Sequence, residues 1–170
     1  MKSLYLLRHA KSSWDNPALS DIDRPLNPRG ERDAPRMGKA LGARLQPMTF
    51  HVSPAERAQS TFRNLQLHWP GLTAEHGVTV AALYTFDYRS LMEWIAQQAS
   101  DLSDLAIVGH NPALTDLTNY LVGYGALANI PTAGWVELTL ELRDWADIPQ
   151  FGGRGQLSYR LFPRELPEAS

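Results

Sequence analysis

The chain has 170 residues and a net charge of −2, with 16 Lys and Arg against 18 Asp and Glu. This length fits one domain, 1–170, and the near balance of charge argues against a nucleic-acid or membrane-surface partner. The lack of cysteine excludes disulfides and thiolate catalysis, and no apolar run could span a bilayer or serve as a signal peptide, so we expect a cytoplasmic protein.

The first element predicted is a strand at 4–7, a short apolar run typical of a strand covered on both faces. After a polar loop, Asn27 and Pro28 form a helix-start signal, with asparagine as the cap and proline at the first helical position. Pro35 conflicts with a straight helix from Pro28, because its ring would clash with the carbonyl group four residues earlier. We therefore expect the helix to restart, with Asp33 as the new cap.

The middle of the chain alternates short apolar runs with amphipathic segments. The apolar runs predict buried strands at 50–53, 78–83 and 105–108. Each is followed by a predicted helix, and the expected starts are Ser53-Pro54, Asp87 and Asn111-Pro112.

The last quarter of the chain changes to a period of two. Apolar and polar residues alternate at 136–142 and again at 157–161, which predicts two paired antiparallel strands. The tail from Pro163 is expected to be loose. Together these elements predict an α/β fold, a three-layer α/β/α sandwich whose mostly parallel sheet has antiparallel C-terminal strands.

Three of the predicted strands end in residues suited to anion chemistry. Arg8 and His9 close the first strand, Arg57 lies in the first turn of the helix after the second, and His110 follows the strand at 105–108. Ligands of open parallel sheets bind at the carboxyl ends of the strands, beside helix N-termini that favour anions. Because arginine forks bind phosphate oxygens bidentately, the expected ligand is a tetrahedral oxyanion.

These motifs resemble those of the histidine phosphatase superfamily, also called phosphoglycerate mutase-like. Arg8-His9-Ala10 is similar to its Arg-His-Gly motif, with alanine where glycine is usual. The segment 53–61 resembles the second motif, and 109–112 resembles the third. The segment 23–30, Asp-Arg-Pro-Leu-Asn-Pro-Arg-Gly, and the small size are similar to the SixA-type phosphohistidine phosphatase branch.

The resemblance implies a role for each matching residue. His9 would be the nucleophile, transiently phosphorylated, and an imidazole with an ordinary pKa of about 6.5 is readily neutral for that task. No metal or other cofactor is expected, because arginines would supply the positive charge. The residues expected to bind the phosphate are Arg8, Arg57 and His110, with Arg24 as a further ligand and Ser12 as a hydroxyl contact.

One departure concerns the general acid. Many relatives place a carboxylate after the third strand, whereas Thr85 stands near that position here and Asp87 is the nearest candidate. A missing acid suits a phosphohistidine substrate, whose leaving imidazole needs less protonation than an alkoxide. We therefore expect a phosphorylated protein as partner, or else a small phosphorylated substrate. The alternatives are a small-molecule phosphomonoesterase or mutase of the same superfamily, and a non-enzymatic phosphate-binding module.

Overall fold

A computed structural model describes residues 1–167 and contains, in that range, a six-stranded sheet with the order β3-β2-β4-β1-β5-β6. β1 to β4 pair in parallel where they are neighbours, and β5 runs antiparallel to both β1 and β6. The expected three-layer α/β/α sandwich, with antiparallel pairing at its C-terminal edge, is confirmed. The strands are β1 (Lys2–Arg8), β2 (Phe50–Val52), β3 (Gly77–Thr79), β4 (Asp104–Gly109), β5 (Trp135–Leu140) and β6 (Gln156–Leu161).

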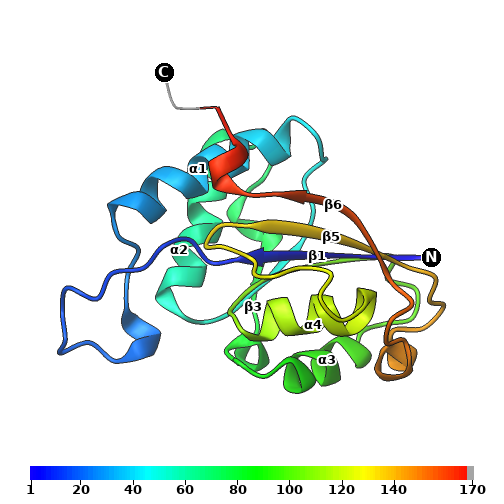
Figure 1. The fold of residues 1–170 in the computed structure, drawn as a ribbon. Coiled ribbons are helices and arrows are strands. Elements are labelled where there is room, and N and C mark those ends of the chain that lie inside the picture. Colours follow the sequence, from blue (N-terminus) through cyan, green and yellow to red (C-terminus); the bar gives the residue numbers. More distant parts are fainter. Residues whose placement is uncertain (168–170) are drawn as a thin grey trace.

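Helices cover both faces of this sheet, α1 and α2 on one side and α3 and α4 on the other (Figure 1). They are α1 (Pro28–Gly42), α2 (Glu56–Leu65), α3 (Tyr88–Ala96) and α4 (Ala113–Val122). Short 3-10 turns complete the connections: η1 (Asp21–Asp23), η2 (Gln66–His68), η3 (Ala74–His76), η4 (Ala81–Leu83), η5 (Trp145–Gln150) and η6 (Pro163–Glu165). Within residues 1–167, no helix is long and apolar enough to cross a membrane.

The two faces of β1 supply two separate cores. Leu4 and Leu6 are fully buried in the core under α3 and α4, while Leu7 is buried in the core under α1 and α2. Burying one such side chain contributes about 1.5–3 kcal/mol. β1 is therefore held rigidly in the centre of the sheet, and this fixes the position of the residues that directly follow it.

Helix α1 begins as predicted but does not restart. The Asn27 side chain accepts a hydrogen bond from the Gly30 amide at 2.9 Å, as expected of a cap. The predicted restart at Asp33 is wrong, because α1 is one helix that contains Pro35. Packing overrides the proline: the buried face of α1 lies directly against α2 and the sheet, and Gly38 contacts the backbone of Leu65.

One helix-cap prediction and one strand prediction also need correction. Ser53 does not cap α2, which begins at Glu56 without a side-chain cap, because the Ser53 hydroxyl is bonded to His110. The strand predicted at 78–83 covers only Gly77–Thr79, and η4 follows it. The pairing of β3 with β2 ends at the hydrogen bond that the Val80 amide donates to the Val52 carbonyl, and Leu83 is then buried in the core.

The segment after β6 is more ordered than expected. The tail predicted to be loose from Pro163 forms η6, with Pro163 buried. The Glu165 carboxylate accepts a hydrogen bond from the Phe162 amide at 3.1 Å. The rest of that prediction, at 168–170, lies outside the described residues.

Candidate active site

The site forms at the carboxyl ends of three neighbouring parallel strands. Arg8 at the end of β1 pairs in register with Gly109 at the end of β4, so His9 and His110 emerge side by side. Their ring centroids are 5.2 Å apart. Ser53, after β2, lies on the other side of His110. Strand pairing thus brings together residues that are separated by about a hundred positions in the sequence.

His9 is held in one tautomer by the backbone. Its Nδ1 lies 2.7 Å from the carbonyl oxygen of Ala10, and a carbonyl can only accept, so Nδ1 carries the proton. The lone pair of the neutral ring is then on Nε2. Burial is the main cause that lowers the pKa of His9 to about 3; the Ala10 bond opposes this effect, and the charges of His110, Arg57 and Arg8 add to it. His9 is therefore a neutral imidazole near neutral pH, with one nitrogen able to act as a nucleophile.

The loop that carries His9 is fastened to α2. The Ala10 amide donates to Thr61 Oγ1 at 2.8 Å, and Thr61 in turn donates to the carbonyl of Arg57 at 2.7 Å. Within residues 1–167, Ala133 is the one non-glycine residue with a positive φ, at 60°. The backbone at Ala10 therefore does not require glycine, which explains how alanine can stand at this place in the motif.

His110 is oriented by Ser53. The Ser53 hydroxyl lies 2.7 Å from His110 Nε2 and accepts a bond from the Ala55 amide. Among residues 1–167, Nε2 is the one acceptor bonded to this hydroxyl, so the hydroxyl donates its proton to Nε2. This arrangement leaves the proton of the neutral ring on Nδ1. Burial, followed by the charge of Arg57, lowers the pKa of His110 to about 3. Sequence reasoning missed this role of Ser53, although its place beside Pro54 in the second motif was noted.

Three buried nitrogens of the site have no hydrogen-bond partner. They are Arg8 Nε, Arg57 Nε and His110 Nδ1, and among residues 1–167 the one other such atom is Trp69 Nε1 in the core. Buried polar groups are normally satisfied, so a cluster of unsatisfied donors indicates what the site is built to bind. A ligand with several acceptor oxygens, such as a phosphoryl group, matches this set.

Arg24 and Ser12 also belong to the site. Arg24 is buried and donates to the Ser12 hydroxyl at 2.8 Å and to the Ser13 carbonyl at 3.2 Å. Its guanidinium carbon lies 3.5 Å from the ring centre of Trp14, a close cation–π contact. Trp14 is itself 72% exposed, so it forms part of the rim rather than the core.

Comparisons with known proteins fit this geometry. A family model described as the histidine phosphatase superfamily (branch 1) matches residues 4–78. An uncharacterized protein of Mycobacterium tuberculosis strain H37Rv is 30% identical over 152 residues, which cover 84% of this chain and 91% of that protein. The chain belongs to the histidine phosphatase superfamily.

Solved structures narrow the place within the superfamily. A candidate phosphohistidine phosphatase SixA from Agrobacterium tumefaciens has a TM-score of 0.75 and 26% identity, covering 94% of this chain and 97% of its own. A protein histidine phosphatase SixA complexed with tungstate has a TM-score of 0.74 at 20% identity, covering 95% and 97%. The chain is a histidine phosphatase superfamily member of the SixA type.

One residue of this superfamily member was not identified from the sequence. Asp21, in η1, accepts from Arg57 Nη2 at 3.0 Å, from Arg24 Nε at 3.2 Å and from the Tyr84 hydroxyl at 2.5 Å. Its backbone carbonyl accepts a further bond from Arg57 at 2.7 Å. Burial raises the pKa of Asp21, but the bonds from Tyr84, Arg57 and Arg24 outweigh it and lower the pKa to about 2. Asp21 is thus an ionised carboxylate that orients two arginines of the site.

Asp87, the candidate acid, is placed at the start of α3. Its two carboxylate oxygens accept from the Arg89 amide and the Ser90 hydroxyl, each at 3.2 Å, so it caps the helix. The groups from this segment that reach His110 are aromatic: the ring centroids of Tyr84 and Phe86 lie 5.5 and 5.4 Å from it. In the described part of the chain, no group of three His, Asp or Glu is placed to hold a metal ion.

Proposed function

We propose that this protein is a phosphatase that removes a phosphoryl group through a phosphohistidine intermediate on His9, with a protein phosphohistidine as its substrate. The observation that carries the proposal is the uncommitted Nε2 of His9, set among three unsatisfied buried donors from Arg8, Arg57 and His110. A binding module needs the donors alone. A nucleophile held neutral, in one tautomer, beside those donors has a use only if a bond is made to it.

In the first step, His9 Nε2 attacks phosphorus and the bond from phosphorus to the leaving nitrogen breaks. The other ring nitrogen of the substrate phosphohistidine carries a proton, so this histidine leaves as a neutral imidazole. Arg8, Arg57 and Arg24 lie around the transferring group, and their charges offset the negative charge on its oxygens. His110 donates from Nδ1 to one of those oxygens. The proton stays on His9 Nδ1 and is donated to the Ala10 carbonyl, and this hydrogen bond stabilises the ring as it becomes cationic on phosphorylation.

In the second step, water attacks the phosphorus of phosphorylated His9. The bond from phosphorus to Nε2 breaks, inorganic phosphate leaves, and the neutral ring is restored. Because the leaving group of this step is again an imidazole, both steps break the same kind of bond. A site without a strong acid can therefore serve both of them.

The carboxylates in and near the site indicate which kind of leaving group it can serve. Asp21 has a pKa of about 2 and is ionised at neutral pH, so it cannot donate a proton. Asp87 is engaged as the cap of α3. Neither is suited to protonate an alkoxide, whereas the nitrogen of phosphohistidine leaves with little help. The similar protein from Agrobacterium tumefaciens is described as a phosphohistidine phosphatase, and this supports the same substrate class.

The deciding experiment compares leaving groups. We expect kcat/KM to be high for a chemically phosphorylated histidine protein and for phosphoramidate, and to fall steeply from nitrophenyl phosphate to alkyl phosphates. Positioned acid catalysis is typically worth about 10²–10⁴-fold, which sets the expected deficit of the alkyl esters. Asp87→Asn should leave the whole series unchanged if Asp87 acts only as a helix cap.

Two outcomes would overturn the proposal. A shallow dependence on leaving-group basicity that becomes steep in Asp87→Asn would make Asp87 the acid and the protein a general phosphomonoesterase. Return of the phosphoryl group to a second hydroxyl, rather than to water, would identify a mutase. Independence from metals, a cytoplasmic location and a single domain over 1–170 stay predictions.

A further inference from the structure

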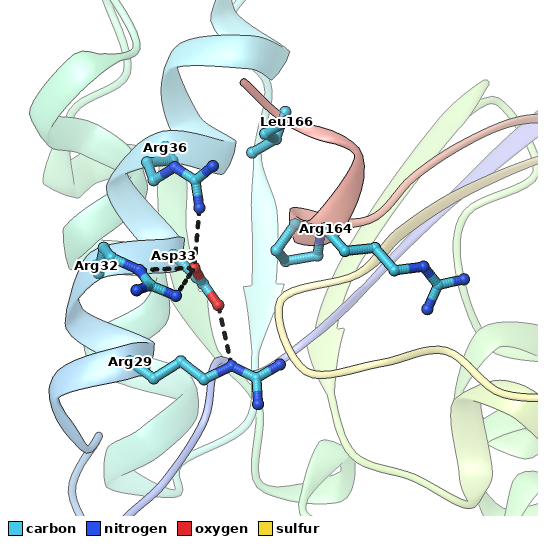
Figure 2. A pocket seen from close by; sticks show the side chains of 7 residues that line it. Arg29, Arg32, Asp33, Arg36, Arg164 and Leu166 are labelled. Atoms are coloured by element: carbon cyan, nitrogen blue, oxygen red, sulfur yellow. Dashed lines mark hydrogen bonds and ion pairs between the residues drawn. The ribbon is translucent and has the colours of Figure 1, made fainter. Parts of the chain in front are cut away.

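A second cluster of positive charge lies outside the catalytic site, between α1 and η6. It lines a pocket of about 500 Å³ formed by Arg29, Arg32, Asp33, Arg36, Pro163, Arg164 and Leu166. We call it the α1 pocket. Figure 2 shows Asp33 in its centre, with three arginines of α1 around the carboxylate and Arg164 on the facing segment. The mechanism proposed above uses none of these side chains.

The buried carboxylate of Asp33 organises the arginines of α1. Its side chain is 3% exposed and lies 3.2 Å from Arg36, 3.4 Å from Arg32 and 3.6 Å from Arg29. Arg36 also donates to the Pro167 carbonyl at 2.8 Å, which joins α1 to the C-terminal segment. The guanidinium groups are thereby held in place before any ligand arrives, which reduces the entropy lost on binding.

The α1 pocket carries more charge than it neutralises. Four arginines and one carboxylate line the pocket, which leaves a surplus of three positive charges in a chain whose net charge is −2. Figure 2 shows that the Arg164 side chain points away from Asp33. Ion pairing within α1 explains why Asp33 is surrounded by arginines, but it does not explain the surplus of positive charge. Clustered arginines are a recurring means of recognising acidic or phosphorylated motifs.

Exposure and position indicate the kind of ligand. Arg29 and Arg32 are 57% and 62% exposed, so their head groups form an open rim, and Pro163 and Leu166 add an apolar wall. An open rim suits a chain segment better than an enclosed metabolite. The start of α1 is fastened to the catalytic loop, because the Asn27 amide donates to the Lys11 carbonyl at 2.9 Å. A segment bound here would belong to a partner that also reaches His9.

We propose that the α1 pocket is a docking site for an acidic segment, rich in Asp and Glu, of the phosphorylated protein substrate. This inference rests on the proposed function, since only a protein substrate can reach both places. Carboxylates of the segment would pair with Arg29, Arg32 and Arg164, and the apolar stems of neighbouring side chains would contact Leu166.

The test measures binding separately from catalysis. The probe is a fluorescein-labelled peptide of alternating Glu and Leu, compared with its Gln counterpart by fluorescence anisotropy. We expect the Glu peptide alone to bind, less tightly as salt rises. Arg29→Gln with Arg32→Gln should weaken it about tenfold, since each exposed ion pair is worth about 0.2–1 kcal/mol. A matched control is Arg143→Gln with Arg154→Gln, two exposed arginines outside this pocket.

Kinetics then separate the two proposals. In the Arg29 and Arg32 double variant, kcat/KM for nitrophenyl phosphate should be unchanged, while KM for an acidic phosphohistidine protein should rise about tenfold. Loss of peptide binding in the Arg143 and Arg154 control to the same extent, or no loss in either variant, would overturn the docking site. So would displacement of the peptide by inorganic triphosphate at much lower concentrations than by an equally charged Glu peptide. Failure of the wild type to hydrolyse any phosphohistidine protein, with peptide binding intact, would instead refute the proposed function.

Discussion

Replacing Asp21 by asparagine tests whether an ionised carboxylate beside the phosphate-binding arginines is a working part of the site. Asp21 bonds to Arg57, Arg24 and Tyr84, and it is the one carboxylate among residues 1–167 that bonds to either of these arginines. An amide of the same size keeps the shape but removes the charge and one acceptor oxygen. The Arg57 bond to the Asp21 backbone carbonyl stays in place.

The loss of stability can be worked out from the pKa of Asp21. A carboxyl pKa lowered from 3.8 to about 2 corresponds to about 2.5 kcal/mol, since one pKa unit is worth 1.36 kcal/mol. The side chain is 42% exposed, so solvent screening reduces this to about 1 kcal/mol. Because the folded pKa is depressed, the stabilisation is fully present above pH 3.8 and is lost as the pH falls towards 2.

The assay is urea unfolding followed by circular dichroism at pH 7, 5, 4 and 3. Asp21→Asn should be less stable than the wild type by about 1 kcal/mol at pH 7, with the difference shrinking below pH 4. Asp23→Asn is the matched control, since Asp23 lies in the same turn but bonds only to Ser20 among the described side chains. Equal stability of Asp21→Asn and the wild type at every pH would refute the reasoning.

Activity distinguishes positioning from mere stability. Without the Asp21 charge, Arg57 and Arg24 lose a fixed partner, and misplacement of catalytic groups by about 1 Å can cost about 10²-fold. We expect kcat for nitrophenyl phosphate to fall by at least tenfold under conditions where the variant is fully folded. Tungstate affinity should hold or increase, because a competing negative charge is gone. Tighter oxyanion binding with lower kcat is a combination that a purely structural role would not produce.

Four further predictions concern the reacting groups and the need for a metal. His9→Ala should abolish turnover yet keep oxyanion binding, and brief incubation of the wild type with substrate should leave acid-labile phosphate on His9. Because burial lowers the pKa of His9 to about 3, kcat/KM should show no decline near pH 6.5 that could be assigned to protonation of this imidazole. Ser53→Ala, which removes the partner of His110 Nε2, should lower kcat about tenfold with little change in KM, checked by steady-state kinetics. Activity should survive excess chelator; complete loss that is reversed by added zinc or magnesium would contradict this.

The arrangement of the site could be predicted because it depends on strand ends. Parallel pairing of β1, β2 and β4 follows from short apolar runs, and it alone brings Arg8, His9 and His110 to one edge. The motif spacing then identified Arg57, since the first turn of α2 has little freedom relative to β2. Local sequence patterns were enough to predict the placement of residues that directly follow the central strands of the sheet.

The sequence was less informative where tertiary contacts determine the local structure or bring distant residues together. Pro35 argues for a broken helix on local grounds, and only the packing of α1 against α2 keeps the helix whole. Asp21 lies 36 positions before Arg57 in an irregular loop, and no periodicity places the two side chains together. The one available signal was the nearby Asp23-Arg24-Pro25 motif, which identified Arg24 but gave no reason to include its neighbour.

The charges of the site work against a protonated carboxyl group within it. Arg8, Arg24 and Arg57 exceed Asp21 by two positive charges, which suits a dianionic phosphoryl group. Hydrogen bonds from Tyr84, Arg57 and Arg24, together with the charge of Arg57, lower the pKa of Asp21 to about 2 against the opposing effect of burial. A general acid must be protonated before the reaction, so a carboxyl held by these arginines would already have lost its proton at neutral pH. The clustered arginines that attract phosphate thus work against acid catalysis in the same site. They favour substrates whose leaving group needs no protonation by a carboxylic acid.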